Sequence, residues 1–204
     1  MELGTLPFTS KAGTVRIYDT DQTTLLLSQH VNLKLGYSYA FSAANYPTAS
    51  PWTSAYSITS VQASEQLPGW QGSNLVDRDL GTIYSSLAFH SSKNDRGAWV
   101  AAWMDFNKGP QNISKIILQA RMLGPSQPIS FPASYDVSVT APDNSAWIDL
   151  GNFKVQPNGT TGTATVQLPK SYSTYGVRIT PSMLTTDESN QNYYFQLGEI
   201  ALAP

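Results

Sequence analysis

Short apolar and aromatic segments recur along the chain, and turn-forming residues separate them. The segments are about five to eight residues long and rich in β-branched and aromatic side chains, and several alternate apolar with polar positions, which is the pattern of β-strands. Helical periodicity is nearly absent, and fourteen glycines and thirteen prolines interrupt the pattern. The chain is therefore predicted to be all-β, an antiparallel β-sandwich with a small N-terminal β extension.

The predicted strands fall into two groups along the chain. The first group comprises residues 14–18, 24–27, 31–35 and 37–41. The second comprises residues 56–63, 98–106, 113–122, 135–140, 147–150, 163–168, 176–180 and 193–202. Residues 98–106 are apolar at nearly every position, which predicts a central strand buried on both faces. Residues 135–140 alternate, which predicts a half-buried strand.

A linker is predicted between the two groups of strands. Residues 45–51 carry two prolines among small residues, which is typical of a connecting segment. We place a boundary near Ala49, with a small β-rich extension or partial domain at 1–50 and the β-sandwich domain at 51–204. About fifty residues alone bury only a marginal core, so the extension is expected to pack on the larger domain or on further sequence.

The composition gives a polar but weakly charged surface. Charged residues make up 13% of the chain, well below the usual quarter. The net charge is −2 and no Lys/Arg cluster occurs, so nucleic-acid binding is not expected. The absence of cysteine excludes disulfides and thiolate chemistry. No apolar run approaches the length of a membrane span, and Met1–Gly4 lacks the features of a signal peptide.

Residues 74–86 form the stretch with the densest candidate chemistry. Asp77 and Asp79 lie two residues apart, followed by Gly81 and the hydroxyl of Thr82. Short acidic side chains, a turn glycine and a hydroxyl supply oxygen ligands for a hard cation such as Ca²⁺. An ordinary Asx-turn, in which each Asp accepts from nearby backbone amides, explains the spacing at least as well, and the EF-hand signature is absent.

Catalysis has little support in the sequence. The chain has two histidines, His30 and His90, and no Gly-x-Ser-x-Gly motif for a serine nucleophile. A glycosidase needs a carboxylate pair, but most acidic residues lie in predicted turns, and Asp77, Asp79 and Glu199 suit a cation better. Phosphate-binding loops and transition-metal spacings are also missing. We therefore predict a protein without catalytic activity.

Ligand binding is the role that remains. Several aromatic residues fall in or beside predicted loops, where an exposed ring is unfavourable without a use: Trp52, Trp70, Tyr84, Phe89 and Tyr172. Flat rings can stack on the C–H faces of sugars. Alternatively the rings cover the ends of the sandwich core, which we expect for at least half of them.

Six motifs in order resemble the discoidin family, also called the coagulation factor V/VIII C-type or galactose-binding-like jelly-roll domain. The family includes many bacterial carbohydrate-binding modules. The motifs are 74–86 (resembling Asn-x-x-Asp-Gly-Asp/Asn-x-x-Thr-x-Trp-Ser), 103–106 (Trp-x-Ile-Asp-Leu), 119–121 with 131–132 and 135–139, Trp147, 176–179 (Tyr-Val-Arg-Ile) and 194–200 (Phe-x-Leu-x-Glu-Ile). The resemblance covers residues 57–203. Arg78 replaces a family glycine, and if that position needs a positive φ the arginine costs about 1 kcal/mol or more.

The resemblance implies a structural Ca²⁺, which many family members hold between this loop and the closing glutamate. By position, the side-chain ligands would be Asp77, Thr82 and Glu199. Backbone carbonyls would complete the shell: those of Asn74, Asp79, Thr82 and Gly198. Such a cation would tie the last strand to an early loop and stabilise the fold.

The resemblance also implies a sugar site on loops at one end of the jelly roll. Family sites use a His, an Arg, an Asn and an aromatic residue, and His90 and Arg121 fall near the matching positions. No residue matches the Asn clearly, and Gln127 is the nearest polar candidate. Stacking partners would be Phe89, Trp70 and Tyr193. Arg121 can equally be a structural residue.

The function implied by the resemblance is a non-catalytic carbohydrate-binding module of an exported or cell-surface bacterial protein. Its ligands would be galactose-type or amino sugars. The main alternative is an adhesion module that binds a protein partner. Phospholipid binding is a third possibility, but it requires exposed apolar residues flanked by Lys or Arg, and none stands out.

Overall fold

The computed structural model describes residues 10–18, 25–34, 55–123, 127–187, 189 and 191–204. The chain divides into two compact units, Met1–Ser50 and Pro51–Pro204. In the first unit, β1 (Ser10–Tyr18) and β2 (Leu25–Lys34) form an antiparallel pair. The strand predicted at 37–41 and the linker at 45–51, with the boundary at Ala49, lie outside the described residues.

The prediction of two strands within β2 was wrong. The polar residues Ser28–His30 interrupt the apolar pattern, but they pair with Thr14–Arg16 in an unbroken ladder. Backbone pairing with β1 therefore continues through the polar segment and makes one strand.

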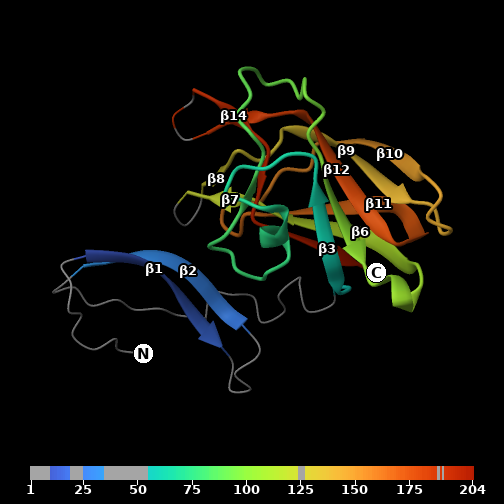
Figure 1. The fold of residues 1–204 in the computed structure, drawn as a ribbon, viewed down its shortest axis with the longest axis horizontal. Coiled ribbons are helices and arrows are strands. Elements are labelled where there is room, and N and C mark those ends of the chain that lie inside the picture. The colour runs from blue at the N-terminus through green and yellow to red at the C-terminus, as the bar shows by residue number, and fades with distance from the viewer. Residues whose placement is uncertain (1–9, 19–24, 35–54, 124–126, 188, 190) are drawn as a thin grey trace. The chain divides into compact units, whose positions relative to one another are not determined.

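Two larger antiparallel sheets form the body of the second unit, as Figure 1 shows. The five-stranded sheet has the order β10 (Trp147–Phe153), β9 (Ser134–Thr140), β12 (Gly176–Met183), β5 (Val100–Met104) and β3 (Ile58–Ala63). The three-stranded sheet has the order β11 (Thr163–Thr174), β6 (Gln111–Gln119) and β16 (Glu199–Ala203). Among the described residues the only helices are two short 3₁₀ turns, η2 (Gly72–Leu75) and η3 (Phe106–Lys108). The predicted all-β sandwich is confirmed.

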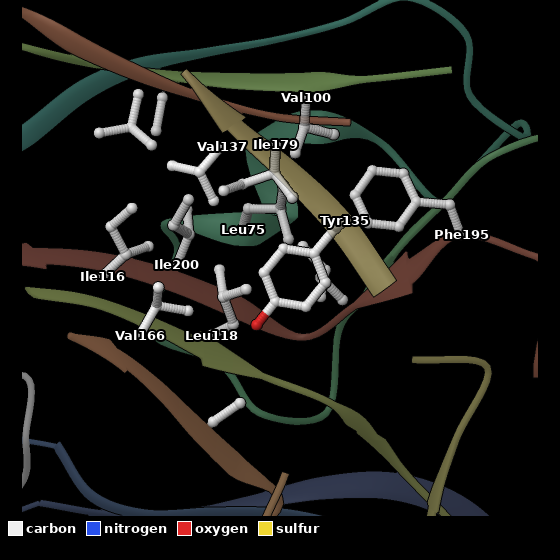
Figure 2. Packing of buried hydrophobic residues seen from close by; sticks show 14 of the residues in the cluster. Leu75, Val100, Ile116, Leu118, Tyr135, Val137, Val166, Ile179, Phe195 and Ile200 are labelled. Atoms are coloured by element: carbon white, nitrogen blue, oxygen red, sulfur yellow. The ribbon is translucent and has the colours of Figure 1, made fainter. Parts of the chain in front are cut away.

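The core lies between these two sheets and follows the two-residue period of the strands. Ile116 and Leu118 of β6 point inward, whereas Ile117 between them belongs to a separate small cluster on the other face. Figure 2 shows inward-facing side chains of both sheets packed against each other. The main buried side chains are Val100, Ala102, Met104, Val137, Val139, Val177 and Ile179 from the larger sheet, and Val166, Ile200 and Leu202 from the smaller one. Alternation along the sequence thus encodes the sandwich.

Aromatic rings cover part of the outer face of the five-stranded sheet. The Trp103 indole lies across Gly176, where a Cβ atom would come within 2.8 Å of the ring. This glycine lets Trp103 reach Trp147 on β10, with ring centroids 5.2 Å apart. On its other side Trp103 stacks with Phe106, which stacks with Tyr175. The predicted central strand β5 is therefore covered on both faces.

Strand β9 is more buried than its alternating sequence predicts. Asp136 is the one residue of β9 that is partly exposed, and the others are buried. The outward-facing Ser138 and Thr140 are short, and their cross-strand neighbours Arg178 and Trp147 carry long side chains. Long side chains on neighbouring strands cover short ones, so the prediction of a half-buried strand was wrong.

One end of the sandwich carries three short strand pairs. The link from β6 to β9 forms β7 (Arg121–Met122) and β8 (Pro128–Ile129), which pair with each other. The link from β12 to β16 forms β13 (Thr185–Thr186), β14 (Tyr193–Tyr194) and β15 (Gln196–Leu197). Strand β13 pairs with β14, and β15 pairs with β4 (Tyr84–Ser85). Figure 1 shows β7, β8 and β14 together at this end. The single strands predicted at 113–122 and 193–202 are therefore interrupted, because the chain leaves the sheets to form these pairs.

The described part of the chain contains no helix with the length and apolarity that a membrane span requires.

Candidate functional site

A pocket of about 480 Å³ opens at this end of the sandwich. We call it the loop-end pocket, and its lining residues are Gln127, Pro128, Ile129, Ser130, Phe131, Gln156, Pro157, Thr185, Thr186 and Asp187. Three segments far apart in sequence build its walls: β8 with the residues after it, the loop that follows β10, and β13 with the residue after it. The polar lining groups are amides, hydroxyls and one carboxylate, all of which form hydrogen bonds.

Side chains tie the walls of the pocket to one another. The Thr185 hydroxyl donates to the carbonyl of Phe131 (2.8 Å). The Gln156 amide donates to the carbonyls of Pro132 (3.2 Å) and Ala133 (3.1 Å). Ser130 adopts a left-handed backbone conformation with φ of 53°. These contacts within the chain hold the pocket walls together.

Arg121 stands one strand away from the pocket, because β7 pairs with β8 and places Arg121 opposite Ile129. Its Nη1 donates to Gln196 Oε1 (3.2 Å), and Gln196 in turn donates to the Ser85 hydroxyl (3.1 Å). The guanidinium carbon lies 5.2 Å from the centre of the Trp70 ring. The structure thus brings together two of the predicted ligand residues, Arg121 and Trp70, and holds the guanidinium in a fixed place.

Phe89 and Tyr193 form a second pair of predicted ligand residues. Their backbones exchange hydrogen bonds of 2.9 Å and 3.1 Å, and His90 follows Phe89 on the surface. Tyr193 lies opposite Thr186 of the pocket wall. The Phe89 side chain, however, is only 1% exposed and packs in the core. Phe89 as a sugar-stacking residue is therefore a wrong prediction, because core neighbours cover its ring.

Arg96, which the sequence did not single out, covers the Phe89 ring. Its guanidinium carbon lies 3.6 Å from the ring centre. The same guanidinium forms an ion pair with Glu65 (2.7 Å) and donates to the carbonyls of Leu87 and Ala88. Through these contacts Arg96 connects the residues next to β4 with Glu65 and with the ring of Phe89.

Two of the remaining loop aromatics lie in or against the core, as expected for at least half of the set. Tyr84 is fully buried, and its hydroxyl donates to the Glu65 carbonyl (3.0 Å). Burial raises the pKa of Tyr84 above its ordinary value, with the Glu65 charge as a second cause. Tyr172 packs against the core, and Trp52 lies outside the described residues.

Of the predicted ligand residues only Gln127 lines the pocket, and the pocket residues missed by the sequence are Ser130, Gln156, Thr185 and Asp187. They share no motif, since tertiary folding brings their three segments together. Asp187 was interpreted as a turn residue, and it does accept hydrogen bonds from Ser189 Oγ (2.7 Å) and the Ser189 amide (3.1 Å). No local signal distinguishes a turn that lines a pocket from one that does not.

The predicted cation site lies in residues 74–82, which we call the acidic loop. Asp77 Oδ1 accepts from the Asp79 amide and Asp79 Oδ1 from the Gly81 amide, both at 2.9 Å. These are Asx-turns, as the simpler interpretation of the spacing predicts. In addition, the Thr82 hydroxyl donates to Asp77 Oδ2 (2.8 Å).

Glu199 reaches the acidic loop from the first residue of β16. It is only 3% exposed, and its Oε1 has no hydrogen-bond partner among the described residues. Burial raises the pKa of Glu199 to about 9, and the neighbouring Asp77 charge and a hydrogen bond to Asp77 add to this rise. Hydrogen bonds from the amides of Arg78 and Asp79 act in the opposite direction. The fold therefore holds two carboxyl groups side by side.

Arg78 has a φ of 60°, so the family glycine is replaced at a position that does need the left-handed conformation. The loop keeps its turns despite this replacement. Two further predicted ligand residues are Asn74, the first residue of the loop, and Gly198, next to Glu199. The Asn74 side-chain amide donates to the Ile83 carbonyl (2.9 Å), and the Gly198 backbone amide donates to the Gln119 carbonyl (2.7 Å).

The oxygen atoms at the acidic loop are of the kind that bind a hard cation. Adjacent carboxylates, a hydroxyl and backbone carbonyls are the oxygen ligands that Ca²⁺ prefers. Among the described residues no group of three or more acidic, His or Cys side chains could hold a metal ion. A cation here would therefore depend on Asp77 and Glu199 together with Thr82 and the backbone.

Comparison with protein families gives one match. The model of the F5/8 type C domain matches residues 60–199, more than half of the chain and including both the acidic loop and the loop-end pocket. A search of curated protein sequences finds no match.

Solved structures with the same fold include carbohydrate-binding modules. One is the family 32 module of C. perfringens NanJ in complex with galactose, with a TM-score of 0.52 and 12% identity over 70% of this chain and 91% of that chain. Another is the module CBM32-3 of a family 31 glycoside hydrolase from Clostridium perfringens, with a TM-score of 0.55 and 17% identity over 70% and 87%. A third is chitosan-binding module 2 of a chitosanase/glucanase from Paenibacillus sp. IK-5 in complex with chitotriose, with a TM-score of 0.52 and 16% identity over 74% and 98%. At these identities the likeness is one of fold.

Proposed function

Because the chain belongs to the F5/8 type C domain family, we propose that it is a non-catalytic carbohydrate-binding module and that its ligand occupies the loop-end pocket. The observation that carries the proposal is the pocket itself. Its volume of about 480 Å³ lies in the range of small-ligand sites. Amides and hydroxyls of its walls offer both donors and acceptors, as a ligand covered with hydroxyl groups requires.

The apolar part of the lining suits the C–H faces of a sugar ring. Pro128 and Pro157 contribute rigid rings to the two walls that also carry Gln127 and Gln156. Two predicted ligand residues lie one strand away from the lining: Arg121 opposite Ile129, and Tyr193 opposite Thr186. A ligand longer than one sugar would extend toward them.

The class of sugar proposed is galactose-type or amino sugars. The NanJ module was solved with galactose and the Paenibacillus module with chitotriose, and both share this fold. A pocket of this volume is consistent with binding of a glycan end or a short stretch of chain.

Calorimetric titration of the full chain with galactose, N-acetylgalactosamine and chitotriose tests the proposal. We expect at least one of these sugars to bind. Gln127→Ala should weaken its binding about tenfold, the effect of losing roughly 1.4 kcal/mol of hydrogen bonding, and Arg121→Ala by less. Lys115→Ala on the exposed side of β6 is the matched control and should leave binding unchanged. Binding of none of the sugars, or equal binding by wild type and Gln127→Ala, would contradict the proposal.

An adhesion module that binds a protein is the second candidate. A protein interface needs a contiguous apolar centre, and the described surface carries a stack of rings around Phe106, which is 48% exposed. Other exposed large apolar side chains come from separate elements: Leu87, Leu123, Ile148 and Met183. The carbohydrate proposal is favoured because a formed pocket exists, whereas these apolar residues are dispersed.

We also propose a structural Ca²⁺ at the acidic loop, held by the side chains of Asp77, Thr82 and Glu199. Backbone carbonyls would complete the shell: those of Asn74, Asp79, Thr82 and Gly198. The ion would replace the proton that the paired carboxyl groups otherwise share. A calcium-selective chelator should lower the melting temperature and added Ca²⁺ should restore it. An unchanged melting temperature in both conditions would argue against the ion.

A role outside the cell or on its surface is part of the same proposal. Glycans accessible to such a module lie at cell surfaces, and the weakly charged composition is compatible with that placement. Immunolabelling of intact cells of the source organism, with and without permeabilisation, tests it. Labelling only after permeabilisation would contradict it.

A further inference from the structure

The charge among the described residues of the loop-end pocket is negative. Among the ten described residues that line it, Asp187 is the only one with an ionisable side chain. The nearest cation by strand pairing, Arg121, has its guanidinium at Gln196 and Trp70. From this we infer that the pocket selects amino sugars with a free ammonium group over neutral sugars, with Asp187 as the partner of the ammonium. The inference rests on the proposed carbohydrate-binding function and narrows it.

Asp187 is held as a carboxylate in a fixed orientation. Its Oδ1 accepts from the Ser189 hydroxyl (2.7 Å), the Ser189 amide (3.1 Å) and the Gln191 amide (3.4 Å). The hydrogen bond from the Ser189 side chain is the largest cause that keeps the pKa of Asp187 below its ordinary value. The Asp187 amide donates to the Asn192 carbonyl (2.9 Å) and closes the turn. Asp187 therefore lines the pocket with a carboxylate whose orientation the turn already fixes.

An ammonium group is the complement of this arrangement. It carries three donors and no acceptor, and a charge-assisted hydrogen bond to a carboxylate is stronger than a neutral one. The Gln127 and Gln156 side-chain carbonyls can accept further hydrogen bonds from the same ligand. N-acetylation removes the charge and two of the three N–H donors and adds a carbonyl, so the acetylated sugar loses the charge-assisted hydrogen bond and keeps only neutral contacts.

The inference is tested with two ligands of equal length, chitotriose and its fully N-acetylated counterpart, titrated calorimetrically into the full chain. We expect wild type to bind chitotriose about five- to tenfold more tightly, the range for a charge-assisted hydrogen bond that solvent partly screens. Asp187→Asn keeps the turn's acceptor but removes the charge, and it should abolish this preference while leaving the binding of the acetylated sugar unchanged.

Asp143→Asn is a matched control. Asp143 sits in a turn of the same kind, and its Oδ1 accepts from the Ser145 hydroxyl (2.7 Å) and amide (3.0 Å). It lies beyond the other end of β9, away from the pocket. Asp143→Asn changes the net charge by the same amount as Asp187→Asn. Because Asp143 lies away from the pocket, the preference for chitotriose should persist in this variant.

The outcomes separate this inference from the function on which it rests. Equal binding of both trisaccharides by wild type, or a preference that survives in Asp187→Asn, overturns the role of Asp187 and leaves carbohydrate binding in place. Binding of galactose but of neither trisaccharide does the same. If neither trisaccharide nor any other sugar binds, the proposed function fails and the inference fails with it.

Discussion

The acidic loop and the loop-end pocket both carry carboxyl groups at one end of the sandwich, but they use them differently. In the acidic loop, Asp79 and Glu199 are 4% and 3% exposed and lie beside Asp77. In the pocket, Asp187 is partly exposed and held by a hydroxyl and amides. Buried, adjacent carboxyl groups affect the free energy of unfolding, whereas an accessible carboxylate affects ligand choice. The two regions should therefore respond to separate perturbations.

The largest expected effect is the pH dependence of stability through Glu199. Its folded pKa of about 9 lies above the unfolded value of 4.5, so the folded state binds the extra proton. The stabilisation is fully present below pH 4.5 and is lost as the pH rises toward 9, on the order of a few kcal/mol. Urea unfolding at pH 5, 7 and 9 with chelator present should show this decline for wild type and a smaller one for Glu199→Gln.

Added Ca²⁺ sharpens the same measurement. A cation binds the ionised pair, so with saturating Ca²⁺ the decline between pH 5 and 9 should be reduced. If the free energy of unfolding falls equally steeply with pH in wild type and Glu199→Gln, both in chelator, the carboxyl pair of Asp77 and Glu199 does not govern stability.

Asp79→Ala tests the same region by removing a buried acceptor. The Gly81 amide would lose its partner, which should destabilise the fold by about 1–3 kcal/mol and lower the melting temperature by roughly 2–4 °C per kcal/mol. Asp187→Ala, the matching substitution in the pocket, should change stability by no more than about 0.5 kcal/mol. Equal losses for the two variants would remove the distinction between the regions.

Gln156→Ala tests whether the pocket walls are held in place by the fold. It removes the hydrogen bonds to Pro132 and Ala133, and we expect a loss of about 1 kcal/mol in stability together with weaker sugar binding. Calorimetric titration beside urea unfolding measures both. Unchanged sugar binding at reduced stability would mean that the ligand does not use this wall.

The smallest expected effect comes from Arg78→Gly. The left-handed conformation of Arg78 costs about 1–2 kcal/mol, and glycine would remove this strain. Glycine is also freer in the unfolded chain, which offsets part of the stabilisation. A net stabilisation of up to about 1 kcal/mol is expected in urea unfolding, without an effect on sugar binding. A loss of stability would indicate that the arginine side chain makes a contribution larger than its backbone strain.

Sequence patterns predicted which segments of the second unit form strands. They predicted less well how exposed those strands are and at which residues they end. The apolar run of β5 marked a buried strand correctly, because burial on both faces leaves a continuous apolar signal. Exposure of β9 was misjudged, since cover by Trp147 and Arg178 comes from neighbouring strands. The ends of β6 and β16 were misplaced because short strand pairs at the end of the sandwich depend on tertiary contacts.

The acidic loop was predictable and the pocket was not, for a physical reason. Asp77, Asp79 and Thr82 lie within six residues, so their spacing alone limits their geometry, and only Glu199 needed a distant motif. Gln127, Gln156 and Asp187 come from three segments that meet only in the folded chain. Phe89 was misassigned because a loop position does not show whether a ring points to solvent or into the core.

Amide chemical-shift mapping by NMR during titration with chitotriose tests the central claim most directly, because it reports where a sugar binds. The account expects shifts to concentrate in residues 127–131, 156 and 185–187, with little change at 74–82. Shifts centred on the acidic loop or on the rings around Trp103, or no shifts at saturating sugar, would contradict it.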